Sequence, residues 1–253
     1  IYTPNTINAD TATRRAMQMI ARTYDAVEAS EGKVAVALEA QDAIDNFETG
    51  VLSVFLGMDN GLPIQDDLSL LRLFYDMGVR YMTLTYVGNN NICDSCATKE
   101  KRWNGLSPFG IEVVKEMNRL GMLIDVSHIS DDSFRDVIKY SSSPVVATHS
   151  CCRAIANHPR NLTDQMIKDI AATGGVVQIN FYPPFLNSEY AKEFWPLCDA
   201  FEEVEKLWKD NPDQHNDAYE KAKMEMFALK RPSYKEVADH IDHVVKLVGA
   251  DYV

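Results

Sequence analysis

Short apolar runs alternate with segments of helical periodicity along most of the chain. Runs that are apolar throughout predict buried strands, and apolar residues three and four positions apart predict amphipathic helices. The predicted strands cover residues 51–58, 79–85, 122–127, 144–149 and 176–181, after a shorter apolar run at 33–38. The predicted helices cover residues 8–29, 66–78, 107–121, 130–141, 163–175 and 233–249, and residues 250–253 read as the start of a further strand.

Strands that are apolar throughout and separated by helices indicate parallel βαβ units, in which helices cover both faces of a sheet. No G-x-G-x-x-G motif follows any of these strands, which disfavours a doubly wound nucleotide-binding sheet. We therefore expect an α/β fold of the (β/α)8 TIM-barrel type, with residues 1–253 forming a single, partial barrel domain. Residues 187–232 are charged and of helical pattern, and we expect them to be a helical insertion.

The charge balance argues against nucleic acid as a partner. The formal net charge is −12, from 25 basic and 37 acidic side chains, and no basic stripe is visible. No run approaches the roughly 20 apolar residues of a transmembrane helix. The chain opens at Ile1 on a turn-like stretch with no signal-peptide pattern, so the location stays open, an exported or periplasmic protein of a bacterium being one possibility.

Five cysteines are present, of which Cys93 and Cys96 form a C-x-x-C motif. A structural zinc site would need a second pair of ligands, and no pair has suitable spacing. A loop disulfide and two reduced thiols both remain open for this motif. The adjacent Cys151 and Cys152 are expected to be packing residues.

Polar residues of a particular kind follow the predicted strands. Read in chain order, the strand ends carry Asp59, Tyr86, His128, His149 and Asn180. Because the carboxyl ends of barrel strands share one face, these side chains are expected to meet there. Two imidazoles and a carboxylate are the ligands that Zn²⁺ or a similar divalent ion takes in proteins. The remaining histidines, at positions 158, 215, 240 and 243, are expected to be structural residues, explained by helix ends or solvent.

The loop after His149 carries two arginines, Arg153 and Arg160. A guanidinium beside a metal at a barrel mouth suits a substrate carboxylate, which it can hold with two parallel hydrogen bonds. Surface ion pairs with Asp164 or Asp169 would explain the same residues equally well.

Several longer stretches strongly resemble the membrane (renal) dipeptidase family, and the resemblance covers nearly the whole chain. They include "GVRYMTLTY", "NGLSPFGIEVVKEMNRLGMLIDVSH", "PVVATHS", "HPRNLTDQMIKDIAATGGVVQINFYPPFL" and "VADHIDHVVKLVGADYV". The resemblance implies a zinc-dependent dipeptidase of bacterial type on a (β/α)8 barrel. It further implies two Zn²⁺ ions in the complete protein, a dipeptide substrate and a homodimer.

The resemblance also implies roles for individual residues. Asp59, in "GMDNG", matches the carboxylate that bridges the two metals, and His128 and His149 match the histidines of the second metal. Arg160 matches the arginine that binds the substrate's C-terminal carboxylate. Tyr86 matches the residue that polarises the scissile carbonyl, so catalytic roles fall on Asp59 and Tyr86. Substrate contacts are expected from Arg160, Tyr86, Asn180 and Phe185.

Three departures from the family pattern bear on activity. Asp59 stands where the family has Glu, and Tyr86 stands where it has His. Tyr can still donate a hydrogen bond to an oxyanion, but it brings no cation. The family's opening H-x-D strand and its closing strand with an acid/base Asp have no match in residues 1–253. We read the chain as part of a longer protein.

Two hypotheses follow. The first is a metallodipeptidase that hydrolyses short peptides with a free C-terminal carboxylate by means of a metal-activated hydroxide. The alternative is a catalytically impaired relative, a dipeptidase-like barrel that acts as a binding protein. The departures from the family pattern at Asp59 and Tyr86 keep this alternative open.

Overall fold

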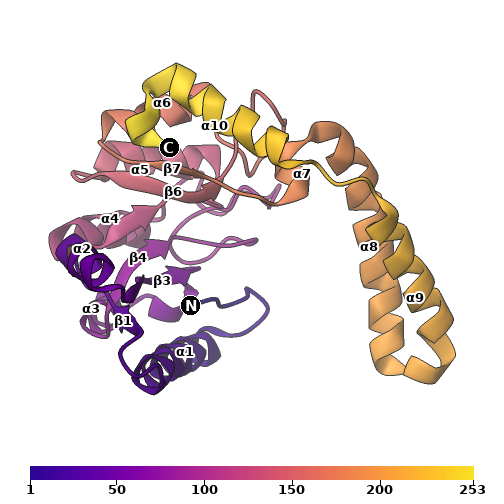
Figure 1. Cartoon of the computed structure of the whole chain (residues 1–253), viewed down its shortest axis with the longest axis horizontal. Coiled ribbons are helices and arrows are strands. Elements are labelled where there is room, and N and C mark those ends of the chain that lie inside the picture. The colour runs from indigo at the N-terminus through magenta and orange to yellow at the C-terminus, as the bar shows by residue number, and fades with distance from the viewer. The chain divides into compact units, whose positions relative to one another are not determined.

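The computed structural model describes residues 1–253 and contains a five-stranded sheet in the order β3-β4-β5-β6-β7 (Figure 1). The strands are β3 (Leu56–Asp59), β4 (Val79–Thr83), β5 (Leu123–Asp125), β6 (Val145–Ser150) and β7 (Val177–Ile179). The pairs β3–β4, β4–β5 and β5–β6 are parallel. Spatial order therefore follows sequence order, as expected for consecutive βαβ units.

Helices connect or flank these strands and account for most of the remaining chain. They are α1 (Ala9–Ala29), α2 (Ala40–Thr49), α3 (Leu68–Asp76), α4 (Pro108–Leu120), α5 (Asp131–Tyr140), α6 (Asp164–Ala172), α7 (Pro183–Leu186), α8 (Ser188–Asp210), α9 (Pro212–Ala228) and α10 (Tyr234–Val248). Two short 3₁₀ turns are η1 (Leu62–Ile64) and η2 (Ala250–Tyr252). The expected α/β architecture and each of the predicted helices are confirmed.

Helix α4 shows why its ends were readable from the sequence. The side chain of Ser107 accepts a hydrogen bond from the backbone N–H of Gly110 at 2.8 Å, and Pro108 occupies the first helical position. Gly121 ends the helix in the left-handed conformation, with a φ of 77°. Each residue satisfies or avoids a backbone group that a helix end leaves without a partner.

The expected helical insertion is confirmed as the hairpin of α8 and α9, drawn in orange and gold in Figure 1. Aromatic side chains join the two helices: the rings of Trp208 and Tyr219 stack with centroids 4.5 Å apart, and Phe201 lies 5.4 Å from Tyr219.

The chain forms two compact units. The first comprises Ile1–Thr148 and Lys168–Val177, and the second comprises His149–Ile167 and Gln178–Val253. The single-domain organisation expected from the sequence stays a prediction.

The run at residues 51–58 was expected to be one buried strand, and this expectation is wrong. It divides into β2 (Leu52–Val54), which pairs with β1 (Val34–Val36) in a separate two-stranded sheet, and β3, which joins the main sheet. Leu52 is 65% exposed, whereas Leu56 and Met58 are buried. An unbroken apolar run does not distinguish its exposed half from its buried half.

Two further differences concern short elements. Residues 250–252, expected to begin a strand, form the 3₁₀ turn η2 instead. Helix α2 was not predicted, and none of its residues is buried. Its ends nevertheless carry signals: Glu39 and Asp42 form a capping box, and Gly50 closes the helix with a φ of 76°.

The cysteines are reduced thiols in the structure. For Cys93 and Cys96, a disulfide and two thiols were both left open, and the structure has two thiols. Burial raises the pKa of the Cys93 thiol. Burial likewise raises the pKa of Cys151 and of Cys152 to about 12, in agreement with their expected packing role.

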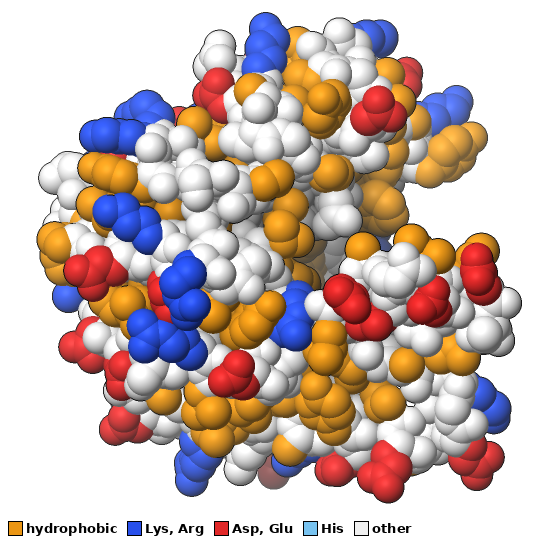
Figure 2. Space-filling view, turned by 90° about the vertical axis from the view of Figure 1, so that its left-hand side faces the viewer, with side chains coloured by type: hydrophobic (Ala, Val, Ile, Leu, Met, Phe, Trp, Pro, Cys, Tyr) orange, Lys and Arg blue, Asp and Glu red, His pale blue; other side chains and the backbone are white.

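The surface in Figure 2 mixes both signs of charge with hydrophobic side chains, so the net charge of −12 is not gathered into one patch of that face. Helix α2 and strand β2 expose large apolar side chains, Phe47 at 85% and Leu52 at 65%. No helix is both long enough and apolar enough to span a membrane.

A single buried carboxylate ties three neighbouring strands together near their carboxyl ends. Asp125, at the end of β5, accepts hydrogen bonds from the hydroxyls of Thr83 in β4 and Thr148 in β6, both at 2.6 Å. Its other oxygen accepts the backbone N–H groups of Ser127 and Thr148, both at 3.0 Å. The side chains of Asp125 and Thr83 are fully buried. This carboxylate fixes the relative heights of the strands that carry the candidate site.

We expect Asp125→Ala to lower the free energy of unfolding by at least about 3 kcal/mol, because several buried donors lose their acceptor together and each costs about 1–3 kcal/mol. Urea denaturation followed by circular dichroism measures the effect. The exposed Asp217 of α9 provides the control, and Asp217→Ala should change stability by less than about 0.5 kcal/mol. Equal losses in the two variants would refute the role given to Asp125.

Candidate metal centre and substrate site

The register of the sheet brings the predicted site residues to one level. Asp59 pairs with Thr83, Thr83 with Asp125, and Asp125 with Val146, so these four residues form one row across β3 to β6. Tyr86, His128 and His149 each stand three positions after the row residue of their own segment, Thr83, Asp125 and Val146 respectively. The expectation that these side chains share one edge of the sheet follows from this register.

Asp59, His128 and His149 each offer one ligand atom, and these atoms lie within 4.8 Å of one another. His149 continues β6 directly from Thr148, which Asp125 holds. Two imidazoles and one carboxylate form a donor set that fits a divalent transition metal such as Zn²⁺. His128 is buried, whereas Asp59 and His149 are partly accessible.

His128 has a left-handed backbone, with a φ of 70°, which is unfavourable for a residue with a β-carbon. Its carbonyl accepts the backbone N–H of Cys96 at 2.9 Å and the hydroxyl of Ser95 at 3.3 Å. The carboxylate of Asp94 in turn accepts the backbone N–H groups of Arg102 and Trp103. The loop between β4 and α4 therefore holds His128 in this conformation.

Two buried asparagines shape the turns that follow β3 and β4. Asn60, directly after Asp59, has a φ of 91°, and its amide donates to the carbonyl of Thr3 at 2.9 Å. Asn90 donates to the side-chain oxygen of Asn60 at 3.2 Å and to the carbonyl of Leu84 at 2.8 Å. Sequence reasoning missed both residues, although Asn before Gly in "DNG" is a signal for a left-handed turn position.

Tyr86 lies beside the cluster. Its ring centroid is 4.6 Å from that of His128, at an interplanar angle of 40°, and Tyr2 packs edge-on against it at 5.0 Å. The hydroxyl of Ser95 donates to the Tyr86 carbonyl at 2.6 Å. The same residue therefore braces both Tyr86 and His128.

The two arginines of the loop after β6 differ in their surroundings. Arg160 is 7% exposed, its Nη2 donates to the His149 carbonyl at 3.1 Å, and its guanidinium lies 5.4 Å from the Phe185 ring centroid. Arg153 donates to the carbonyls of Asn161 and Pro159 and so braces its own loop. The structure therefore brings the guanidinium of Arg160 to the backbone of the candidate ligand His149.

The other expected substrate residues lie in the segment after β7. The side-chain oxygen of Asn180 accepts the backbone N–H of Tyr182 at 2.6 Å, which makes Asn180 a turn-forming residue. Phe185 contacts Arg160 on one side and the ring of His158 at a centroid distance of 4.7 Å. Phe185 is therefore a neighbour of Arg160.

His240 corrects part of the expectation for the remaining histidines. It is a structural residue, but solvent and helix ends do not explain it, because its side chain is fully buried. Its Nδ1 accepts the backbone N–H of Cys152 at 3.0 Å, so Nε2 carries the proton and donates to the Leu186 carbonyl at 3.1 Å. Burial lowers the pKa of His240 and keeps it neutral. Nε2 of His243 lies 2.8 Å from a carboxylate oxygen of Asp164, the first residue of α6.

A profile of the membrane dipeptidase family, Peptidase family M19, matches residues 1–253. The chain belongs to this family. The resemblance inferred from the sequence is thereby confirmed. Fungal relatives include the dipeptidase verJ of Clonostachys rogersoniana, 34% identical over 240 residues, or 95% of this chain and 51% of the relative. An uncharacterised dipeptidase of Schizosaccharomyces pombe is 31% identical over 217 residues, or 85% of this chain and 43% of the relative.

Solved structures give the same result for the fold. The probable dipeptidase PvdM of Pseudomonas aeruginosa superposes with a TM-score of 0.82 at 28% identity, over 97% of this chain and 67% of that one. A metallo peptidase of Rhodobacter sphaeroides, solved with a phosphinate mimic of the dipeptide L-Ala-D-Ala, gives a TM-score of 0.77 at 25% identity, over 98% of this chain and 61% of that one. These likenesses confirm the expected TIM-barrel-like fold class.

The chain spans about half the length of the curated relatives it matches, or less. Membership of a metallopeptidase family supports the use of a metal. The relatives come from fungi and bacteria, so a bacterial origin, like a homodimer, stays a prediction.

Loss of either imidazole should empty the metal cluster. We expect His128→Asn and His149→Ala each to remove bound metal, because three protein ligands are the minimum of an ordinary zinc site. Asn is chosen at position 128 because it tolerates the left-handed backbone there. Metal per protein, measured by plasma mass spectrometry on the full-length protein, provides the test. His215→Ala in α9 serves as the control, and unchanged metal content in both site variants would remove the assignment.

Proposed function

We propose that this chain forms the core of a metal-dependent dipeptidase that hydrolyses short peptides with a free C-terminal carboxylate. The observation that carries the proposal is the convergence of Asp59, His128 and His149 within 4.8 Å, with the Arg160 guanidinium bound to the His149 carbonyl. The proposed hydrolytic centre and the proposed carboxylate-binding group thus share one residue, His149.

The proposed ion is Zn²⁺, and the full-length protein is proposed to hold two such ions. Asp59, His128 and His149 would hold an ion at this edge of the sheet. When bound, it would activate water for attack and polarise the scissile carbonyl. Asp59 is the carboxylate proposed to reach both ions.

Arg160 would orient the substrate. A guanidinium forms two parallel hydrogen bonds with a carboxylate, and the low exposure of Arg160 strengthens that interaction relative to one in bulk water. A continuing peptide chain offers no such charge at this position. The arginine would therefore restrict the substrate to peptides that end one residue after the scissile bond.

Tyr86 is the proposed donor to the developing oxyanion. Its ring contact with His128 places it beside the metal cluster, and a phenol donates a hydrogen bond without carrying a charge. Asn180 and Phe185 complete the proposed substrate contacts, Asn180 by shaping the turn and Phe185 by packing against Arg160.

We expect Tyr86→Phe to lower kcat by roughly ten- to a thousandfold, the range for removal of one oxyanion donor. Tyr86→His should retain or raise kcat. Steady-state hydrolysis of a dipeptide by the full-length protein measures both variants, with Tyr140→Phe at the end of α5 as the matched control. If the Phe variant were as active as the unaltered protein, Tyr86 would be a packing residue of the rim.

We expect Arg160→Ala to reduce the preference for a dipeptide over its C-terminal amide by about ten- to a hundredfold in kcat/KM, because a hydrogen bond to a charged group contributes about 1.5–3 kcal/mol. Arg160→Lys should recover part of the preference, since a point charge cannot make the paired contact. Metal content should not change.

Arg153→Ala is the control for this measurement, because Arg153 binds the carbonyls of its own loop. If Arg153→Ala lost the discrimination and Arg160→Ala kept it, the assignment of the substrate carboxylate to Arg160 would be wrong.

A further inference from the structure

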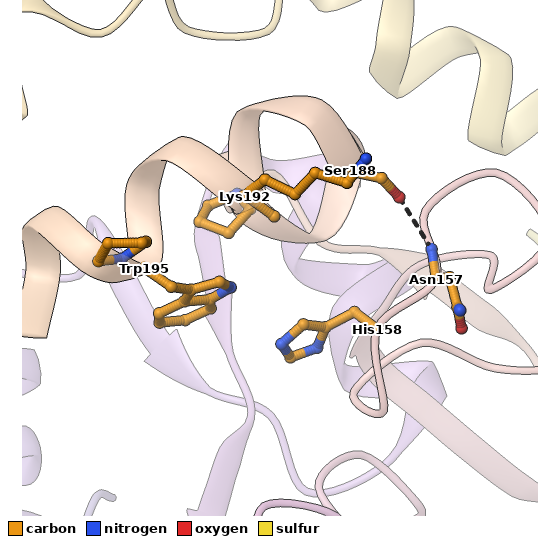
Figure 3. A pocket seen from close by; sticks show the side chains of 8 residues that line it. Asn157, His158, Ser188, Lys192 and Trp195 are labelled. Carbon is orange, nitrogen blue, oxygen red and sulfur yellow. Dashed lines mark hydrogen bonds between the residues drawn. The ribbon is translucent and has the colours of Figure 1, made fainter.

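A cavity of about 600 Å³ lies in the second unit, between the turn at Asn157 and His158 and the first turns of α8 (Figure 3). The metal cluster contributes no residue to its walls. The hydroxyl of Ser188, near the start of α8, accepts the backbone N–H of Asn157 at 3.1 Å and joins the two sides. The volume of the cavity is within the ordinary range of small-molecule sites.

The cavity is connected to Arg160 through two aromatic rings. The Arg160 guanidinium lies 5.4 Å from the Phe185 ring centroid, the Phe185 ring 4.7 Å from that of His158, and the His158 ring 5.7 Å from that of Trp195. The backbone N–H of Arg160 also donates to Nδ1 of His158 at 3.1 Å. His158 is thus the common wall of the arginine site and the cavity.

The apolar part of the wall suits a flat, apolar ligand. Pro184, Ala191, Trp195 and Pro196 supply hydrophobic surface, and the His158 and Trp195 rings are nearly parallel, at an interplanar angle of 21°. Aromatic rings prefer such partners, which they meet by offset stacking or edge to face.

The polar part of the wall does not favour an acidic ligand. Lys192 is the lysine of the lining, and its ammonium group is 2.6 Å from the carboxylate of Glu189. His158 is the other ionisable group. Burial, with the charges of Arg160 and Arg153, lowers its pKa and keeps it neutral at pH 7. Because its Nδ1 accepts from Arg160, Nε2 carries the proton and can donate to a polar atom at a ring edge.

We propose that this cavity is the subsite for the side chain of the substrate's C-terminal residue, and that it selects an aromatic side chain. The inference rests on the proposed function, because it requires the substrate carboxylate at Arg160. The carboxylate and the side chain of a C-terminal residue share one α-carbon, so a side chain that extends past Phe185 and His158 would enter the cavity. Trp195 and Ala191, both from the helical insertion, then determine specificity.

The test compares kcat/KM for Ala-Phe and Ala-Ala in the full-length protein. We expect the unaltered protein to favour Ala-Phe, and Trp195→Ala to reduce the ratio by about two- to tenfold, the effect of one aromatic pair. Ala191→Phe makes the opposite change, because it fills the cavity instead of enlarging it. This variant should hydrolyse Ala-Phe more slowly and Ala-Ala at a similar rate. Trp208→Ala is the matched control, since Trp208 lies on the same helix but stacks on Tyr219.

Each outcome bears on one proposal. An unchanged ratio in both Trp195→Ala and Ala191→Phe, or a preference for Ala-Glu over Ala-Phe, would overturn the aromatic subsite while hydrolysis itself upholds the dipeptidase. Failure of the unaltered, metal-loaded protein to cleave any of the three dipeptides would contradict the dipeptidase, and the subsite with it.

Discussion

The Asp125 carboxylate is the interaction on which the candidate site depends. It accepts two hydroxyls and two backbone N–H groups from β4, β6 and the turn after β5, and so fixes three strands at one height. Tyr86, His128 and His149 each stand three positions after the residue of their segment that lies in the row across β3 to β6. A change of one residue in the register of any of these strands would turn its site residue to the other face of the sheet. A buried charge with four donors is costly to desolvate, but it specifies one register where apolar packing would allow several.

Sequence periodicity predicted the elements that bury one face and carry distinct ends. Helix α4 has Ser107, Pro108 and Gly121 at its ends and apolar residues facing the sheet, so local and tertiary preferences agree. Helix α2, which buries no residue, was missed, and the division of residues 51–58 into β2 and β3 was missed because both halves are apolar. Burial depends on which segment lies opposite, and this information is not local to the run.

The candidate ligands were predictable for a different reason. A histidine directly after a buried apolar strand is conspicuous, and parallel strands deliver their ends to one edge, so His128 and His149 could be placed together without coordinates. Spacing alone could not decide between Arg153 and Arg160, because both lie in one loop. The family resemblance pointed to Arg160; in the structure Arg153 binds carbonyls of its own loop, whereas Arg160 binds the carbonyl of His149. Nor does any local pattern reveal that Ser95, in the loop between β4 and α4, contacts the carbonyls of both Tyr86 and His128.

The metal cluster and the cavity beside His158 are stabilised by different interactions. The proposed chemistry and the proposed selectivity therefore depend on different parts of the structure. The metal cluster and Tyr86 depend on the sheet register and on buried polar networks, in which a substitution leaves several groups without partners. The cavity beside His158 depends on packing among Phe185, Trp195 and the first turns of α8, part of an insertion whose helices contact mainly each other. Ring stacking tolerates replacement of one apolar side chain by another of similar volume far better than a buried carboxylate tolerates loss of its donors. Under the proposed function, an insertion of this kind can change which side chain is accepted while the sheet keeps the candidate metal ligands in place.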